Sequence, residues 1–273
     1  MSPSDKLRIH SNNLRIEIIE MIYNAGSGHS GGSLSCAEIL AVLYEEIMDV
    51  RPKQPDWPLR DRLILSKGHA APALYAALAL KGYFDPLMLR TLRQFESCLQ
   101  GHPCMFKLPG VEMSTGSLGL GISAGVGMAL SARLKDQGWR VFVLCGDGEL
   151  QEGQNWEALM SAAKWDLGNL CVIIDHNDVQ LDGKTCDIMP LGDLESKISA
   201  FGLNTVKCDG HDVDSLLDGF RQCAASCAPS ALIASTVKGK GVSFMEGRSE
   251  WHGRKIERDQ YESALNELRE NMK

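Results

Sequence analysis

The sequence predicts an α/β fold: a mostly parallel sheet flanked by helices in three layers, formed by one domain over residues 1–273. Short apolar runs rich in β-branched residues alternate with segments of helical periodicity. Residues 141–179 read as strand, helix and strand, a right-handed crossover that sets two strands parallel. With 273 residues and 44% hydrophobic content, the chain can bury one large core, and no internal repeat or linker divides it.

The N-terminal part is predicted to be mainly helical, because its apolar residues recur at helical spacing. In chain order we expect helices at residues 14–23 and 36–47, a buried strand at 62–65 and a helix at 70–80. A glycine-rich loop at residues 26–32 separates the first two helices, and another loop carries His69.

The middle of the chain contains a long loop and an unusual helix. Residues 94–115 show no clear period and include prolines and glycines, and so long a loop in a compact domain usually has a functional reason. Residues 118–133 are predicted to form a helix rich in small residues. Since each glycine costs about 1 kcal/mol in a helix, we expect this helix to pack closely against the sheet, a cofactor or a partner.

The C-terminal half supplies most of the predicted sheet. Strands are expected at residues 139–144, 170–174, 204–207 and 230–237, and helices at 149–165, 213–223 and 257–272. In the helix at 149–165, one stripe is expected to comprise Leu150, Trp156, Leu159, Met160, Ala163 and Lys164. The last helix is polar and is expected at the surface.

Composition excludes several classes of function. The net charge is −7, and no stretch of the sequence combines clustered lysines and arginines with aromatic residues. We therefore expect no nucleic-acid partner. No apolar run approaches the roughly 18 residues that cross a membrane, and the N-terminus lacks an apolar signal segment. The nine cysteines include no CxxC motif and are expected to be reduced thiols. These features predict a cytoplasmic protein.

Polar residues follow two neighbouring strands of the predicted sheet. Asp147 lies after the apolar run at residues 141–145, and Asn177 lies after the next strand. Carboxyl ends of parallel strands are where such sheets bind ligands, so the two side chains should converge. Gly146 and Gly148 would let a phosphate approach the backbone. Oxygen ligands of this kind suit Mg²⁺ or Ca²⁺ that carries a diphosphate better than they suit zinc.

The segment Gly146-Asp-Gly148, together with Asn177, resembles the GDG…N signature of thiamine-diphosphate enzymes. Further segments resemble transketolase, in the order found in that family. They are Gly26-Ser-Gly-His29, Leu65-Ser-Lys-Gly-His-Ala70, Gly101-His-Pro103, Ser114-Thr-Gly-Ser-Leu-Gly-Leu-Gly121, Gly148-Glu-Leu-Gln-Glu-Gly153, Asp209-Gly-His-Asp212, Lys238-Gly-Lys-Gly241 and Trp251-His-Gly253. The resemblance implies a thiamine-diphosphate-binding fold, with Mg²⁺ as the metal and Ca²⁺ or Mn²⁺ as possible substitutes. It also implies that Asp147, Asn177 and the backbone carbonyl of Val179 are the metal ligands.

Four histidines in glycine-flanked loops match active-site histidines of transketolases. The resemblance assigns His69 and His252 to the cofactor diphosphate, and His29 and His102 to the hydroxyls and carbonyl oxygen of a sugar. Lys238, at the end of a predicted strand, would lie in the same crevice as a point charge on the diphosphate.

The remaining predicted site residues also follow from the resemblance. Gly116, Ser117 and Leu118 match the segment that lines the thiamine ring, and Gly148 matches a contact to the diphosphate. Glu152 matches a glutamate that links paired active sites through the subunit interface, although an exposed helix partner is an equal alternative. His10 and His176 are assigned structural roles, and His211 is expected to cap the following helix or its turn.

The implied reaction is the transfer of a two-carbon ketol unit from a ketose, or ketose phosphate, to an aldose or its phosphate. Full transketolases continue into a pyrimidine-binding domain, which carries a glutamate that activates the cofactor, and into a C-terminal domain. This chain is therefore interpreted as the N-terminal subunit of a split transketolase. A second chain would complete it, in a two-fold heterotetramer that buries the glycine-rich face at residues 119–127 and the helix at 149–165.

Three alternatives remain at this point. An artificial truncation would also lack the second domain, but the terminal helix and Met1 disfavour it. An E1 α subunit of a 2-oxoacid dehydrogenase or decarboxylase also carries GDG…N, but the sugar-reading histidines do not fit it. A non-catalytic cofactor-binding subunit would bind the cofactor without turnover.

Overall fold

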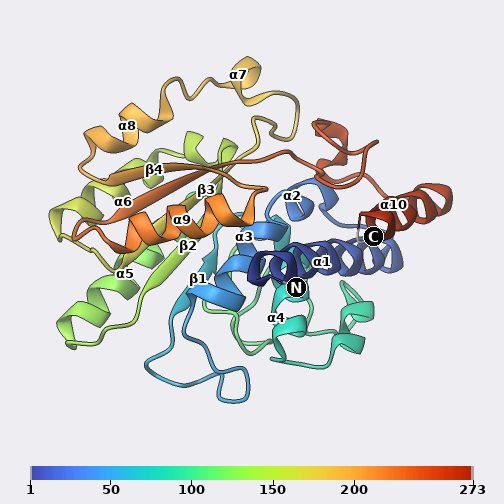
Figure 1. Cartoon of the computed structure of the whole chain (residues 1–273), viewed down its shortest axis with the longest axis horizontal. Coiled ribbons are helices and arrows are strands. Elements are labelled where there is room, and N and C mark those ends of the chain that lie inside the picture. Colours follow the sequence, from blue (N-terminus) through green and yellow to red (C-terminus); the bar gives the residue numbers. More distant parts are fainter. Residues whose placement is uncertain (1, 272–273) are drawn as a thin grey trace.

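The computed structural model describes residues 2–271 and contains one five-stranded sheet in which every neighbouring pair of strands is parallel (Figure 1). The strand order is β1-β2-β3-β5-β4. The strands are β1 (Arg62–Leu65), β2 (Val141–Gly146), β3 (Leu170–His176), β4 (Asn204–Asp209) and β5 (Ser230–Ser235). The predicted parallel α/β fold is confirmed.

Helices cover both faces of the sheet and produce three layers. One apolar core joins a face of the sheet to α1 (Pro3–Ala25), α3 (Ala37–Val42), α4 (Ala71–Lys81) and α9 (Val213–Ala224). The other core joins the opposite face to α5 (Gly121–Leu134), α6 (Gly153–Lys164) and α8 (Leu194–Ala200). Strands buried on both sides explain the nearly continuous apolar runs of β2 and β3.

The N-terminal helices differ in extent from the prediction. The first helix begins at Pro3 rather than residue 14, because Ser2 and Asp5 form a capping box at its start. The short helix α2 (Ser30–Leu34) occupies part of the predicted glycine-rich loop. Helix α3 continues into a π-helical turn at Leu43–Ile47. The helix expected at residues 36–47 is therefore present, but it changes from α-helical to π-helical geometry after Val42.

Several boundaries in the C-terminal half also move. A 3₁₀ turn at Gly148–Gln151 precedes α6, which begins at Gly153. The stripe that α6 buries includes Ala158, Leu159 and Ala162. Met160 is 59% exposed and Lys164 is exposed, so the predictions for these two residues were wrong. Strand β5 ends at Ser235, and Lys238 therefore lies in a loop. Short helices α7 (Thr185–Ile188) and α8 were not predicted, and α10 spans Arg258–Glu270, with residue 272 outside the described part.

The glycine-rich helix α5 packs tightly on the sheet, which is one of the three close contacts predicted for it. A Cβ at Gly121 would lie 2.4 Å from the Cβ of Ser66, and one at Gly125 would lie 2.5 Å from Cγ2 of Val143. By contrast, a Cβ at Gly127 would meet no atom within 4 Å. Two of these glycines therefore serve close helix–sheet packing, and the third lies on an open side of the helix.

The predicted long loop is confirmed: between a 3₁₀ helix at Pro86–Thr91 and α5, residues 92–120 contain neither helix nor strand. This loop carries His102 and the segment 114–119 to the carboxyl end of the sheet. Among residues 2–271, no helix has the length and apolar character needed to cross a membrane.

Candidate functional site

The carboxyl ends of β2 and β3 form one wall of a cavity of about 270 Å³. Gly146, the last residue of β2, is in register with Asp175 of β3, so the residues that follow each strand emerge side by side. Asp147, Asn177 and Val179 all line this cavity. The convergence expected from the strand–helix–strand pattern is therefore present.

Asp147 is a buried carboxylate, only 2% exposed, held by backbone donors. Its Oδ1 accepts the N–H of Gly148 at 2.8 Å, and its Oδ2 accepts the N–H of Asp178 at 2.7 Å. Burial raises the pKa of Asp147, and the negative charge of Asp175 raises it further. A cation beside this carboxylate would oppose both effects and favour its charged form.

The loop after β3 presents two more oxygen atoms beside Asp147. The Asn177 side chain donates from Nδ2 to Asp175 Oδ2 at 3.2 Å and accepts the N–H of Val179 at Oδ1, also at 3.2 Å. The carbonyl oxygen of Val179 accepts from Lys238 Nζ at 3.0 Å. One carboxylate, one amide oxygen and one backbone carbonyl are ligands that Mg²⁺ and Ca²⁺ accept, so these residues fit the implied metal.

Lys238 supports an anionic ligand in the same cavity. Its side chain is 2% exposed, and its ammonium contacts the carbonyls of Val179 and Gln180 and lies 3.0 Å from Nδ1 of His252. Within residues 2–271 it has no carboxylate inside salt-bridge distance. Burial lowers its pKa to about 8, with the charge of Lys67 contributing. A buried cation without an anionic partner, facing a cavity, fits a diphosphate.

The four predicted histidines form one cluster next to this cavity. The rings of His69 and His252 are 4.9 Å apart between centroids, and both residues line the cavity. The ring of His29 lies 5.3 Å from each of these and 6.3 Å from that of His102. The pKa of each of the four histidines is lowered, mainly by burial, and reaches about 4 for His29 and about 3 for His252. The cluster is therefore neutral at pH 7.

The loop residues predicted around the thiamine ring are only partly gathered at the cavity. Leu118, Gly148 and Glu152 line it. Gly116 does not line the cavity; its φ is +144°, and a Cβ at this position would lie 3.1 Å from the ring of His102. Ser117 is exposed. Glu152 is exposed as well and begins α6 as its N-cap residue.

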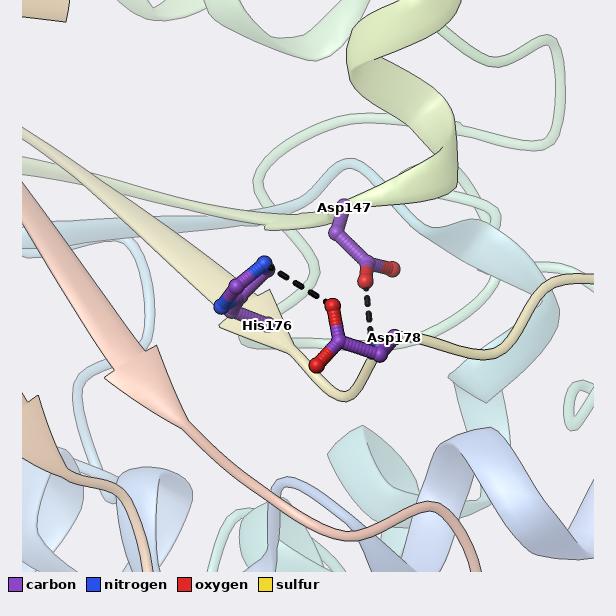
Figure 2. Close-up of side chains that lie close together, drawn as sticks. All are labelled: Asp147, His176 and Asp178. Atoms are coloured by element: carbon purple, nitrogen blue, oxygen red, sulfur yellow. Dashed lines mark hydrogen bonds and ion pairs between the residues drawn. The ribbon is translucent and has the colours of Figure 1, made fainter. Parts of the chain in front are cut away.

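A cluster that sequence reasoning missed adjoins Asp147. His176 Nε2 lies 3.1 Å from Asp178 Oδ1, and one ligand atom from each of Asp147, His176 and Asp178 lies within 4.8 Å of the others (Figure 2). Asp178 has a left-handed backbone with φ +59°, which turns the chain between Asn177 and Val179. His176, to which the sequence assigned a structural role, thus lies in a group of side chains with the spacing of a divalent-cation site that would share Asp147.

A buried ion pair, of which Lys67 lines the cavity, was also missed. Lys67 is 2% exposed and donates to Asp175, which is fully buried, and to the carbonyl oxygen of Gly32 at 2.7 Å. Asp175 also accepts from Ser35 Oγ at 2.6 Å and from Thr236. Burial alone would raise the pKa of Asp175, but Lys67 and these donors lower it. The signal in the sequence was an aspartate inside an otherwise apolar strand.

His211 differs from the prediction, because it does not cap α9. Asp212 is the N-cap residue, and its side chain accepts from the N–H of Asp214. His211 instead accepts the N–H of Val237 at Nε2, at 2.8 Å, and its Nδ1 lies 3.0 Å from Glu38. It therefore anchors the loop that carries Lys238.

Comparison with known proteins gives one consistent result. The family model described as the transketolase, thiamine diphosphate binding domain matches residues 7–271. The chain is 44% identical over 263 residues to a 6-deoxy-6-sulfo-D-fructose transketolase subunit of Clostridium sp. (strain MSTE9), covering 96% of each. It is 40% identical over 269 residues to an apulose-4-phosphate transketolase subunit of Phocaeicola vulgatus, covering 98% of this chain and 95% of the relative.

Longer proteins match over only part of their length. The human transketolase is 38% identical over 263 residues, which cover 96% of this chain and 42% of the human protein. The crystal structure of the Campylobacter jejuni transketolase superposes with a TM-score of 0.92 at 32% identity, covering 98% of this chain and 43% of that one. The chain thus spans less than half the length of these transketolases.

Proposed function

Because the chain belongs to the transketolase family, as the N-terminal, thiamine-diphosphate-binding subunit of a two-component enzyme, we propose that it transfers a two-carbon ketol unit from an anionic ketose to an aldose together with a partner chain. The observation that carries the proposal is the single cavity in which the oxygens of Asp147, Asn177 and Val179 meet the buried ammonium of Lys238. The relatives reported above favour ketol transfer over a 2-oxoacid dehydrogenase.

The proposed cofactor site has a metal part and a diphosphate part. Asp147, Asn177 and the Val179 carbonyl would hold Mg²⁺, or Ca²⁺ or Mn²⁺ in its place. Lys238, His69, His252 and the backbone at Gly148 would contact the diphosphate, and Gly116, Ser117 and Leu118 would lie along the thiamine ring. Thiamine diphosphate, when bound, supplies a carbon nucleophile and an electron sink for cleavage of a carbon–carbon bond.

The protein's own part is to bind, orient and exchange protons with the sugar. His29 and His102 would bind its hydroxyl and carbonyl oxygens. Since the four histidines are neutral at pH 7, each can donate from one ring nitrogen and accept at the other. Neutral imidazoles suit this task, because protons must move in both directions during cleavage and transfer.

The partner chain would supply what corresponds to the remainder of a full-length transketolase, including the glutamate that activates the cofactor. We propose a two-fold heterotetramer in which Glu152 lies near the axis and links paired sites. Trp156 is partly engaged within the chain, since its ring lies 5.5 Å from that of Phe201, whereas Met160 is exposed and available to a neighbour. The free cysteines fit a reducing compartment such as the cytoplasm.

The substrate class rests on the two relatives of similar length. Their names specify a sulfonated ketose and a ketose phosphate, so both act on sugars with an anionic group. We propose a ketose with a phosphate or sulfonate group as the donor for this chain.

The test is reconstitution with the partner chain. Ketol transfer should be absent with either purified chain alone and should appear on mixing the two with thiamine diphosphate and Mg²⁺. A mixture that contains Asp147→Ala in place of the wild-type chain is the matched control and should remain inactive. Full turnover by the 273-residue chain without a partner would reject the proposal.

A further inference from the structure

Arg93 links the long loop at residues 92–120 to the loop that carries His29. Its Nη1 donates to Ser27 Oγ at 3.2 Å, and its Nη2 lies 3.4 Å from His29 Nδ1. The Arg93 backbone is left-handed, with φ +60°, and its N–H donates to the carbonyl of Leu99 at 2.9 Å. The guanidinium is therefore directed at two points of one neighbouring loop from an anchored backbone.

Two further features hold this arrangement in place. A Cβ at Gly101 would lie 3.1 Å from Nε of Arg93, so the glycine leaves the space that the guanidinium occupies. On the other side, the carbonyl of His29 accepts from the backbone N–H of Ser33 at 3.3 Å and from its hydroxyl at 2.7 Å. The His29 backbone is thus anchored, and Gly101 leaves room for the guanidinium of the exposed residue Arg93.

The contact determines which nitrogen of His29 carries the proton. A guanidinium has donors and no acceptor, so Nδ1 of His29 must be unprotonated to receive it. Burial lowers the pKa of His29 to about 4, and Arg93, His102 and Lys238 contribute to this lowering, so the ring is neutral and carries one proton. With Nδ1 facing the guanidinium, the geometry favours Nε2 as the protonated nitrogen. The groups that face His29 are Arg93, Lys238 and the rings of His69, His102 and His252.

The protonated nitrogen is left available to a ligand. Within the described residues, Nε2 of His29 has no hydrogen-bond partner, and the ring lies among the other three histidines. We propose that Arg93 is a positioning residue that locks His29 in its Nε2–H tautomer, so that His29 donates a hydrogen bond to a substrate oxygen. The role toward substrate rests on the proposed function, whereas the tautomer does not.

The tautomer can be measured on the full chain without cofactor or partner. Histidine labelled with ¹⁵N distinguishes protonated from unprotonated ring nitrogens, and loss of signals in His29→Gln assigns the residue. Wild type should show His29 with Nε2 protonated and Nδ1 unprotonated at pH 7.5, and Arg93→Met should show a mixture of both tautomers. Arg90→Met, which removes a guanidinium in the preceding 3₁₀ helix beside Glu17, is the matched control and should leave the His29 signals unchanged.

Activity of the reconstituted enzyme then tests the consequence. Arg93→Met should lower kcat/KM about tenfold to a hundredfold, while the affinity for thiamine diphosphate stays within about twofold because Lys238 and Asp147 are untouched. A wild-type His29 that carries its proton on Nδ1, or His29 signals that Arg93→Met leaves unchanged, would overturn the inference. Since the spectra need no turnover, they decide it even if reconstitution fails.

Discussion

Replacing Lys67 by methionine should destabilise the chain strongly, because it leaves a buried carboxylate without its cation. Lys67 is 2% exposed and Asp175 is fully buried, so water cannot replace the lost ammonium. The substitution also removes the donor to the carbonyl of Gly32. Removing one partner of a buried pair costs about 3–5 kcal/mol, and methionine retains most of the apolar stem, so we expect a loss in that range. The total stability of a domain is about 5–15 kcal/mol.

The pH dependence of this loss has a definite sign. In the wild type the pKa of Asp175 is lowered, so its contribution to stability is present above about pH 4 and is lost only in stronger acid. Without Lys67, burial dominates and raises the folded-state pKa of Asp175 above its unfolded value. The folded variant then binds the extra proton as the pH falls. The difference in unfolding free energy between variant and wild type should therefore shrink from pH 7.5 to pH 5.

Urea unfolding followed by tryptophan fluorescence and circular dichroism measures this difference, with chelator present and without cofactor. Lys107→Met, at an exposed loop lysine, is the matched control and should change stability by less than about 0.5 kcal/mol. A loss below about 1 kcal/mol for Lys67→Met, or a loss that grows on acidification, would refute the reasoning.

Three further outcomes are expected. Asp147→Ala should abolish binding of Mg²⁺ and thiamine diphosphate with the fold intact, and unchanged affinity in calorimetry would contradict the metal assignment. Gly125→Ala should destabilise the chain by about 1–2 kcal/mol in the same urea assay, because the added Cβ would press on Val143. Gly127→Ala is the matched control: its Cβ would contact no atom, so it should stabilise the chain by up to about 1 kcal/mol. Equal effects of the two substitutions would exclude close packing at Gly125 as the cause of destabilisation. Light scattering of the reconstituted complex should give a mass for two copies of each chain, and a single 29.9 kDa species with the partner present would reject the heterotetramer.

The sequence by itself determined the parallel α/β fold and predicted the place of the candidate cofactor site. Alternation of apolar strands with helices is a local pattern, and right-handed crossovers leave few arrangements of such elements. Because Asp147 and Asn177 directly follow neighbouring strands, their convergence needed no knowledge of side-chain packing. The histidines and Lys238 were found through family segments, and the structure brings them to the same end of the sheet.

Only the tertiary structure decided which polar residues are partners across the fold. Lys67 and Asp175 are 108 positions apart, and Arg93 and His29 are 64 apart, so no local pattern links them. The same holds for His211, whose bond to Val237 replaces the expected helix cap. Propensity and periodicity report on neighbours within a few turns of the chain, whereas the pairing of buried charges depends on which distant segments the packed core brings into contact.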